Sequence, residues 1–407
     1  MTFVPGRLTH DLAGPYPPAT RGRIVLWGLL AAFPFGGMTW QVLHYLVALR
    51  RLGFDVWYVE DSDRAVYSAS TYLVTEDCAD NIQYLAEYMA ALRLEDRWVF
   101  RTPGTDEVCG AAGSVSELRQ LYRQADAAIN LCGAQEPRPD HREAKRLVYL
   151  QTDPVADQVA VARGDCERIQ ELDGYDFHFT YGENLGAEDC EVPVERYDWQ
   201  TTRPPVCVDW WESESPPPES AALTTVAKWR HESKDVVWGS ATWHWSKDYE
   251  FRKFMDVAAR ATLPVEIAVS SISEGDLASL REHGWRTVPS ASVKDPSDYR
   301  DYIRDSLGEF TVAKEQYVAP RSGWFSDRSV CYLAAGRPVV MQETAFSRYI
   351  PTGEGLFSFE TGDEAVAAID RIASDYPGHS RAATEIAKAY FSGERVVEDM
   401  LKGMGIA

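Results

Sequence analysis

The chain has 407 residues, of which 45% are hydrophobic and 25% are charged, and its formal net charge is −21. These proportions are globular, and the length exceeds what one compact core accommodates, so they predict two α/β domains of about two hundred residues each. The acidic excess argues against binding to DNA, RNA or an anionic lipid surface, because such binding depends on Lys and Arg.

Neither a membrane span nor an export signal is visible in the sequence. The best apolar run, 24–35, is interrupted by Gly28 and Pro34 and falls short of the roughly 20 residues that a spanning helix needs. The seven cysteines are widely spaced and include no Cys-x-x-Cys pair, so they indicate neither a disulfide framework nor a structural zinc site. We therefore expect a cytoplasmic protein with reduced thiols.

Strands and helices alternate through the first half of the chain. Residues 1–20 contain four prolines and little periodicity, which predicts a loose leader. A buried strand, the turn Phe35-Gly36-Gly37, a helix opening at Thr39 and a second strand then form a βαβ unit. We expect the strands of this half at 24–27, 55–59, 127–131, 146–150 and 175–180, with a long helix at 78–94.

A stretch rich in Pro, Ser and acidic residues, stiffest at Pro216–Pro218, predicts a linker before a second alternating series. The strands of this series are expected at 235–238, 265–269, 286–289, 310–313 and 339–341, with helices at 247–261 and 274–283. The predicted organisation is a leader (1–20), a first Rossmann-like domain (21–205), a linker (206–220), a second Rossmann-like domain (221–380) and a helical tail (381–407).

The stretch 310–359 is the most informative part of the chain. It reads as a strand, a polar loop with glycine, a capped helix, a strand and a second glycine turn. Ser322 and Gly323 allow the backbone to approach a ligand, and Ser326 or Asp327 can cap the helix and leave N–H groups for an anion. Arginines at 321 and 328 flank the turn. This arrangement favours a pocket for a phosphorylated ligand, although an ordinary α/β unit with a satisfied cap remains the alternative.

Two motifs in this stretch carry a resemblance. Ala-Gly-Arg-Pro-Val-Val at 335–340, followed by Pro-Thr-Gly-Glu-Gly-Leu at 351–356, resembles the donor-binding half of GT-B glycosyltransferases. The resemblance implies two doubly wound Rossmann-like domains facing a cleft, of which 21–205 binds the acceptor and 221–380 binds the donor. It also implies a C-terminal helix that crosses back to the first domain, and a nucleoside diphosphate sugar as co-substrate. Many retaining members have a glutamate five residues before the helix-ending glycine, where this chain has Cys331. Ribose recognition is then expected from Asp327 or Glu343.

A second donor segment is expected at 239–247, directly after the strand predicted to open the second domain. Its small residues permit close backbone approach, while His244 and Lys247 can reach phosphate oxygens. The alternative is that its tryptophans are core and His244 is a solvated loop residue. The full set of donor candidates, in which Val288 and Pro289 form an edge of the base pocket, is Gly37, Gly239, Ser240, His244, Lys247, Val288, Pro289, Arg321, Ser322, Gly323, Ser326, Asp327, Arg328 and Ser329.

Asp153 follows a buried strand of the first domain and is expected at the cleft edge, where a carboxylate can act as a general base in an inverting enzyme. It could equally cap the next helix. His44 is the second catalytic candidate, although its apolar helix favours a packed histidine, and His178 has the same ambiguity. The acceptor-binding candidates are Gly36, Thr39, Tyr181 and Glu183.

Asp61-Ser62-Asp63 is not a convincing metal site. In the GT-B design, helix termini and basic side chains neutralise the leaving diphosphate, so the resemblance implies no metal and no cofactor. We expect a hexosyltransferase that uses a UDP or dTDP sugar and a small-molecule acceptor, a natural product or metabolite. The alternatives are a nucleotide-sugar epimerase or hydrolase of the same fold and a non-catalytic nucleotide-sugar binding protein.

Overall fold

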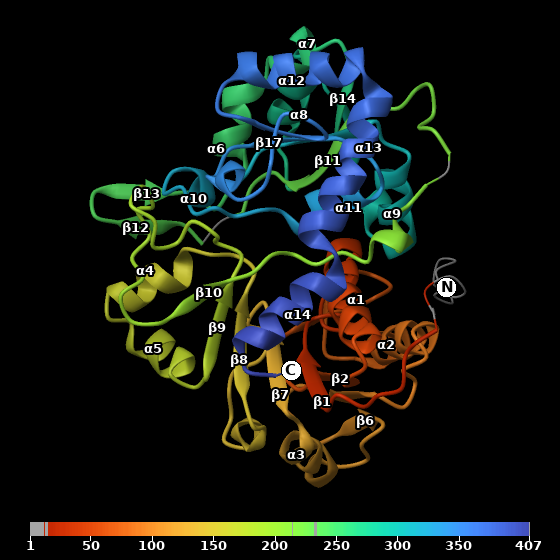
Figure 1. Ribbon diagram of the computed structural model, residues 1–407, viewed down its shortest axis with the longest axis vertical. Helices are drawn as coiled ribbons and strands as arrows, with labels where there is room; N and C mark the ends of the chain where they lie inside the picture. The colour runs from red at the N-terminus through yellow and green to blue at the C-terminus, as the bar shows by residue number, and fades with distance from the viewer. Residues whose placement is uncertain (1–11, 13–14, 214, 232–233, 407) are drawn as a thin grey trace.

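The computed structural model describes residues 12, 15–213, 215–231 and 234–406, so most of the predicted leader lies outside the described residues. Figure 1 shows two α/β bodies stacked one above the other, with the first half of the chain in the lower body and most of the second half in the upper one. The predicted α/β class, with two doubly wound domains, is confirmed.

The first domain is built on an eight-stranded sheet in the order β10-β9-β8-β7-β1-β2-β5-β6, in which neighbouring strands are parallel except for β5 and β6. Its strands are β1 (Arg23–Trp27), β2 (Asp55–Glu60), β5 (Trp98–Arg101), β6 (Val108–Gly110), β7 (Ala127–Leu131), β8 (Leu147–Gln151), β9 (Phe177–Thr180) and β10 (Trp199–Thr201). Its helices are α1 (Gly36–Arg51), α2 (Ala79–Ala91), α3 (Val115–Gln124), α4 (Ala156–Ala162) and α5 (Cys166–Leu172), and a small hairpin joins β3 (Val66–Tyr67) and β4 (Val74–Thr75).

The second domain contains a six-stranded, fully parallel sheet in the order β15-β14-β11-β16-β17-β18. Its strands are β11 (Leu223–Lys228), β14 (Val265–Ser270), β15 (Arg286–Pro289), β16 (Gly308–Thr311), β17 (Val339–Gln342) and β18 (Leu356–Phe359). Its helices are α6 (Asp248–Phe251), α7 (Val257–Arg260), α8 (Glu274–Glu282), α9 (Pro296–Arg304), α10 (Glu315–Val318), α11 (Asp327–Ala334) and α12 (Gly362–Ser374).

Both sheets have the strand order of a doubly wound nucleotide-binding fold. In the second sheet the chain first builds β11, β14 and β15 in one direction, then returns to add β16, β17 and β18 on the other side of β11. The first sheet reverses in the same way between β1 and β7. Ligands of such sheets bind beyond the carboxyl ends of the strands at the point of reversal. The topology therefore directs attention to the loops after β1, β7, β11 and β16.

The prediction that a strand at 235–238 opens the sheet of the second domain is wrong. That role belongs to β11, and the predicted segment instead forms a separate antiparallel hairpin of β12 (Val236–Trp238) and β13 (Ala241–Trp243). Gly239 has a φ of 59° in the hairpin turn, a conformation that suits glycine. The predicted helix at 247–261 is likewise broken into short turns, α6 and α7 with a 3-10 turn between them.

The C-terminal tail returns to the first domain, as predicted. Helix α13 (Tyr376–Ile386) still packs on α11 and β18 of the second domain, and a π-turn at Ala387–Phe391 redirects the chain into α14 (Gly393–Gly403). Helix α14 packs along α1, and Figure 1 shows this last segment descending from the upper body to the lower one. No helix in the described part of the chain combines the length and apolar composition of a membrane-spanning segment.

One apolar core runs through both domains. It joins α1 of the first domain to α11, α13 and α14, and at its centre Trp40 packs between the second domain and the segment that connects the domains. The Trp40 indole donates to the carbonyl of Pro296 at 2.9 Å. The domains are therefore joined through this core, and a cleft remains between them.

Candidate functional site

The cleft between the domains has a volume of about 520 Å³ and lies where the carboxyl ends of the two sheets face each other. Lys228 is the last residue of β11, and Lys314 lies just beyond β16 in the second domain. Opposite them, Cys132 directly follows β7 and Thr152 follows β8 in the first domain. The cleft thus occupies the switch points of both sheets, as the topology predicts.

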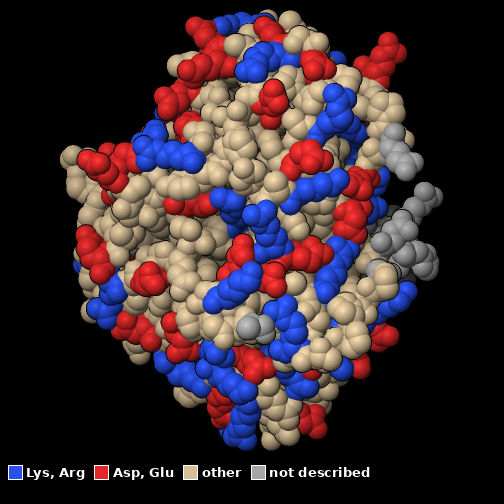
Figure 2. Space-filling model, viewed as in Figure 1, with Lys and Arg blue, Asp and Glu red and all other residues tan. Residues whose placement is uncertain are grey.

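Cations gather on the second-domain side of the cleft although the protein as a whole is strongly acidic. Lys228, Lys234, Lys247, Lys314 and Arg328 all line it. On the outer face shown in Figure 2, by contrast, Lys and Arg are interspersed with Asp and Glu. A concave site with this local charge favours an anionic ligand.

Lys247 lies on the loop before α6 and, like Lys228 and Lys234, has no carboxylate of the described chain within ion-pair distance. Burial, with Arg328 and Lys314 nearby, holds the pKa of Lys247 well below its usual value. A bound anion would supply the charge that the protein does not.

Arg328 is held rigidly at the base of the cleft. Its guanidinium donates to Glu309 at 2.6 Å, to the Val226 carbonyl at 2.7 Å and to Thr311 Oγ1 at 2.9 Å. Glu309 is fully buried, so the ion pair fixes the charge of Arg328 in place beneath the end of β11. Arg328 thus contributes a fixed positive potential, with three of its donors bound to protein acceptors.

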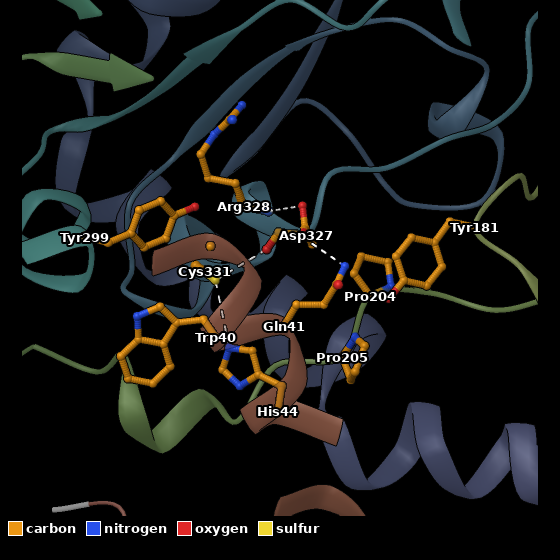
Figure 3. A pocket seen from close by; sticks show the side chains of 11 residues that line it. Trp40, Gln41, His44, Tyr181, Pro204, Pro205, Tyr299, Asp327, Arg328 and Cys331 are labelled. Atoms are coloured by element: carbon orange, nitrogen blue, oxygen red, sulfur yellow. Dashed lines mark hydrogen bonds between the residues drawn. The ribbon is translucent and has the colours of Figure 1, made fainter. Parts of the chain in front are cut away.

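Helix α11 begins at the same wall. Ser326 caps it by accepting from the Arg328 amide, and Ser326, Asp327 and Arg328 all line the cleft, which places the helix N-terminus there. Figure 3 shows Gln41 of α1 pointing across to Asp327, whose carboxylate accepts from the Gln41 amide at 3.2 Å. Burial raises the pKa of Asp327. The helix start therefore offers a positive dipole end and a carboxyl group with a reduced tendency to ionise.

Asp153 lies on the opposite wall. Its carboxylate accepts from Lys314 Nζ at 3.1 Å and from the Tyr317 hydroxyl, and both partners come from the second domain. Burial acts to raise its pKa, but Lys314, Tyr317 and Lys234 outweigh burial and hold the pKa below the usual value. Asp153 still exposes 48% of its side chain, so an ionised carboxylate faces the cleft.

His44, the second catalytic candidate, lies away from the cleft. It is 2% exposed among Trp40, Trp210 and Trp211, and its Nδ1 accepts from the Cys207 amide at 3.1 Å. Burial lowers its pKa to about 3. The adjoining void, seen in Figure 3, measures about 10 Å³ and admits one water at most. His44 is therefore a packed histidine and cannot reach a substrate in this conformation.

The other predicted site residues are distributed unevenly. Of the donor and acceptor candidates, those that line the cleft are Lys247, Ser326, Asp327, Arg328 and Tyr181. Gly37 borders only the small void near His44. The donor candidates that line neither space are Gly239, Ser240, His244, Val288, Pro289, Arg321, Ser322, Gly323 and Ser329. The acceptor candidates that line neither are Gly36, Thr39 and Glu183.

Several of these residues hold the two domains together instead. Arg321 pairs with Asp189 at 2.8 Å, and a Cβ on Gly323 would lie 2.3 Å from the Asn184 amide nitrogen. Glu183 accepts three hydrogen bonds from Arg203. The Arg321–Asp189 pair and the Gly323 contact join the two domains, whereas the Glu183–Arg203 pair lies within the first domain.

The remaining candidates have structural roles or exposed positions. Ser322 Oγ donates to the Tyr317 carbonyl, and Ser329 is fully buried beside Met341. Thr39 Oγ1 hydrogen-bonds to the Tyr84 hydroxyl at 2.6 Å.

Gly36 and the hairpin residues also have local roles. The Gly36 amide donates to the Lys294 carbonyl. Gly239 and Ser240 are exposed in the β12–β13 turn, and His244 pairs with Asp235 at 2.8 Å.

Glu343, proposed for ribose recognition, accepts from the Ala345 amide at 2.6 Å and is not among the cleft residues. It fixes its own turn, which leaves Asp327 as the candidate that faces the cleft.

Sequence reasoning missed several cleft residues, notably Arg64, Lys228, Lys234 and Lys314. Lys314 could have been found, because it directly follows the predicted strand 310–313. Lys228 was not identified as a site residue because the strand that it ends, β11, was not predicted. Arg64 follows β2 in a loop, and only tertiary contact brings it to the cleft.

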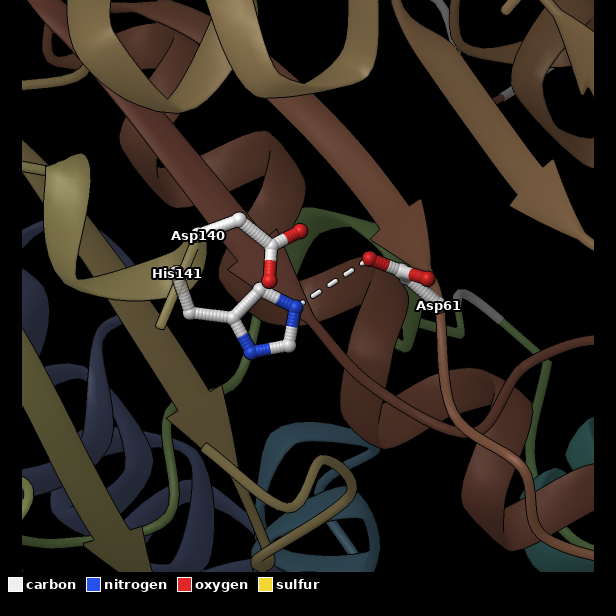
Figure 4. A group of neighbouring side chains, drawn as sticks. All are labelled: Asp61, Asp140 and His141. Atoms are coloured by element: carbon white, nitrogen blue, oxygen red, sulfur yellow. Dashed lines mark hydrogen bonds and ion pairs between the residues drawn. The ribbon is translucent and has the colours of Figure 1, made fainter. Parts of the chain in front are cut away.

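Asp61, Asp140 and His141 form the one group in the described residues with the spacing of metal ligands (Figure 4). Asp61 is fully buried and accepts from His141 at 3.1 Å, and it also pairs with Arg101 and Arg138. Two guanidinium groups beside one carboxylate repel a metal ion. The group is therefore a buried charge network that ties β2 to the loop before β8.

Comparison with known proteins supports the fold. No protein-family model and no curated protein sequence matches the chain. Among solved structures, the chain is similar to AviGT4, a glycosyltransferase of avilamycin A biosynthesis, with 12% identity and a TM-score of 0.52 over 94% of this chain and 96% of that one.

Two further solved structures have comparable sequence identities and TM-scores. An alpha-glucosyltransferase solved with UDP and a 13-mer DNA has 10% identity and a TM-score of 0.57, over 94% of this chain and 100% of that one. HepE of Anabaena, solved with UDP-glucose, has 10% identity and a TM-score of 0.52, over 94% of this chain and 99% of that one. At these identities the similarity establishes the fold, and the predicted GT-B architecture is confirmed.

Proposed function

We propose that the protein is a glycosyltransferase that moves a hexose from a UDP or dTDP sugar to a small-molecule acceptor. The observation that carries the proposal is the group of Lys228, Lys247 and Arg328 around the start of α11, facing an ionised Asp153 across the cleft. This is the position in a doubly wound sheet where a nucleotide is expected.

The second domain supplies the features that a diphosphate requires. The N-terminus of α11 directs the positive end of its dipole at the cleft, Lys247 is a cation without an acidic partner in the described chain, and Arg328 adds fixed charge. UDP or UDP-glucose is present in two of the similar structures, which supports the same class of donor here.

The same cations favour bond cleavage. When the bond from the sugar to the diphosphate breaks, negative charge grows on the leaving phosphate, and preorganised cations in a water-poor cleft stabilise that charge. Lys228, Lys247 and Arg328 can perform this role, so metal independence forms part of the proposal. The nucleoside diphosphate sugar acts as co-substrate, and no other cofactor is proposed.

Asp153 is the proposed catalytic carboxylate. Lys314 and Tyr317 hold it ionised, so it can accept a hydrogen bond from an acceptor hydroxyl and orient that oxygen toward the sugar. Its lowered pKa makes it a weak proton acceptor in the ground state, but its negative charge stabilises the positive charge that develops on the sugar ring.

The acceptor is proposed to bind on the first-domain side and to be small. The acidic net charge of −21 disfavours a nucleic acid acceptor. All seven cysteines are free, which is consistent with the proposed cytoplasmic location.

Calorimetric titration with UDP, dTDP, GDP and ADP, each with magnesium and with EDTA, tests the donor assignment. Selective binding of one diphosphate, unchanged by EDTA, supports it, whereas no binding of any refutes it. Product analysis with the matching nucleotide sugar then separates the candidates: sugar transferred to an added acceptor indicates a transferase, sugar isomer or free sugar an epimerase or hydrolase, and binding without turnover a binding protein.

A further inference from the structure

A second chamber opens from the cleft into the first domain. It has a volume of about 420 Å³ and shares Arg64, Thr152, Asp153 and Lys234 with the cleft, so the two spaces are continuous. Its deeper part is lined by Tyr149, Gln151, Asp157 and Arg168 of the first domain.

The β12–β13 hairpin covers this chamber. The hairpin belongs to the second domain by sequence, yet β12 packs on α4 of the first domain, and Arg163 of the α4 end donates to the Val237 carbonyl. Figure 1 shows the hairpin projecting beside the upper body, above α4. Val236, Asp235 and Trp245 from this segment line the chamber. The covering residues thus make it a pocket at the junction of both domains.

The carboxylates of the chamber already have partners within the protein. Asp157 accepts from the Tyr149 hydroxyl and the Gln151 amide, both at 2.7 Å, and pairs with Arg168 at 3.4 Å. Asp235 pairs with His244. Asp153 is held by Lys314 and Tyr317, as described above. Arg168 is also satisfied, because it pairs with Glu171 at 2.9 Å.

Two cations of the chamber, Arg64 and Lys234, have no carboxylate partner in the described chain. The described residues provide no carboxylate within ion-pair distance of Arg64, whose guanidinium donates to the Gly133 carbonyl at 2.8 Å. Lys234 lies 4.9 Å from the centre of the Trp245 ring and likewise has no acidic partner within that distance in the described chain. The remaining guanidinium donors of Arg64 match the geometry of a carboxylate or phosphate.

We propose that the chamber is the acceptor site and that the acceptor is a hydroxyl-rich molecule carrying an anionic group. The anion binds Arg64 and Lys234, the hydroxyl groups meet Gln151, Asp157 and Tyr149, and the reacting hydroxyl lies beside Asp153 at the mouth of the chamber. This inference rests on the proposed function, since it assigns the acceptor of the same reaction.

The test uses the full-length protein saturated with UDP and three probes: methyl β-D-glucuronide, glucose 6-phosphate and neutral methyl β-D-glucoside. Binding is followed by saturation-transfer NMR, and the variants are Arg64→Gln, Arg64→Lys and the surface control Arg119→Ala. We expect at least one charged probe to bind more tightly than the neutral one. Arg64→Gln should weaken that probe about tenfold or more, while Arg64→Lys restores part of the loss and Arg119→Ala changes nothing.

The preferred charged probe shows whether the anion is a carboxylate or a phosphate. Equal binding of all three probes, no binding of either charged probe, or charged binding that survives Arg64→Gln overturns the inference. UDP affinity is measured in every variant. If the unmodified protein does not bind UDP, the donor site is refuted. Failure of the proposed function is therefore distinguishable from failure of the acceptor inference alone.

Discussion

Replacing Lys247 with methionine should weaken nucleotide binding without weakening the fold. The side chain is half-buried in the cleft without an acidic partner in the described chain, and its pKa is lowered by burial and by Arg328 and Lys314. A charged hydrogen bond to a phosphate contributes about 1.5–3 kcal/mol, so Lys247→Met should raise the Kd for UDP about 10- to 100-fold.

The stability change has the opposite sign from that of most buried substitutions. A lysine whose folded pKa lies below its unfolded pKa binds fewer protons in the folded state, so its charge costs stability at neutral pH and the cost falls as pH rises through the lowered pKa toward 10.5. Methionine removes that cost and fills a similar volume. The unliganded variant should therefore unfold at the same temperature as the parent or at a higher one.

Calorimetry with UDP and thermal unfolding without ligand measure both effects, with Lys145→Met as the control. Lys145 is 63% exposed and pairs with Asp126 on the surface, so its loss should change neither quantity. The affinity of the parent for UDP should also fall with rising pH below the ordinary lysine range, and Lys247→Met should lose this dependence. Unchanged UDP affinity would refute the placement of the diphosphate beside Lys247, and a lowered unfolding temperature would refute the stability cost assigned to its charge.

Three further results are expected. Asp153→Asn should reduce turnover about 100-fold or more and leave UDP binding equal or tighter, because Lys314 loses its acidic partner; full turnover in a transfer assay would remove Asp153 from catalysis. Arg328→Ala should destabilise the protein by about 3–5 kcal/mol in urea unfolding, because Glu309 is left charged and buried, and a change near zero would contradict the ion pair. EDTA should alter neither transfer activity nor unfolding temperature, since Asp61 pairs with two arginines; recovery of lost activity by an added divalent cation would argue for a metal.

The parts of the fold that sequence predicted best are governed by local rules. The strand, capped helix and glycine turn of 310–359 follow from apolar runs, Ser326 as a cap and glycine after the helix, and all three are present. Strand β11 was not predicted because Leu223–Lys228 follows the proline-rich linker, and its two threonines interrupt the apolar run that is typical of a buried strand. The apolar run near 236 was taken in its place, although it forms a hairpin that packs on another domain.

The candidate site was predicted less well because tertiary contacts decide it. Arg321 has the charge and position of a phosphate ligand in the sequence, yet Asp189 of the other domain neutralises it. Asp153 and Arg328 follow from the rule that ligands lie at the carboxyl ends of parallel strands, and both line the cleft. Arg64 and Lys234 come from loops whose paths depend on the packing of both domains, so no local pattern identifies them.

The shared apolar core makes the two halves of this protein one cooperative unit. Val397, Met400 and Leu401 of the C-terminal helix are buried against the first domain, while the same cluster contains Phe325 and Tyr332 of the second. A chain cut between the halves would leave a broad apolar face on each fragment, open to aggregation. Nucleotide bound by the second domain should consequently raise the unfolding temperature of the first domain as well. A chimaera that combines the donor domain of one such protein with the first domain of another should fold only if the C-terminal tail comes from the same protein as the first domain.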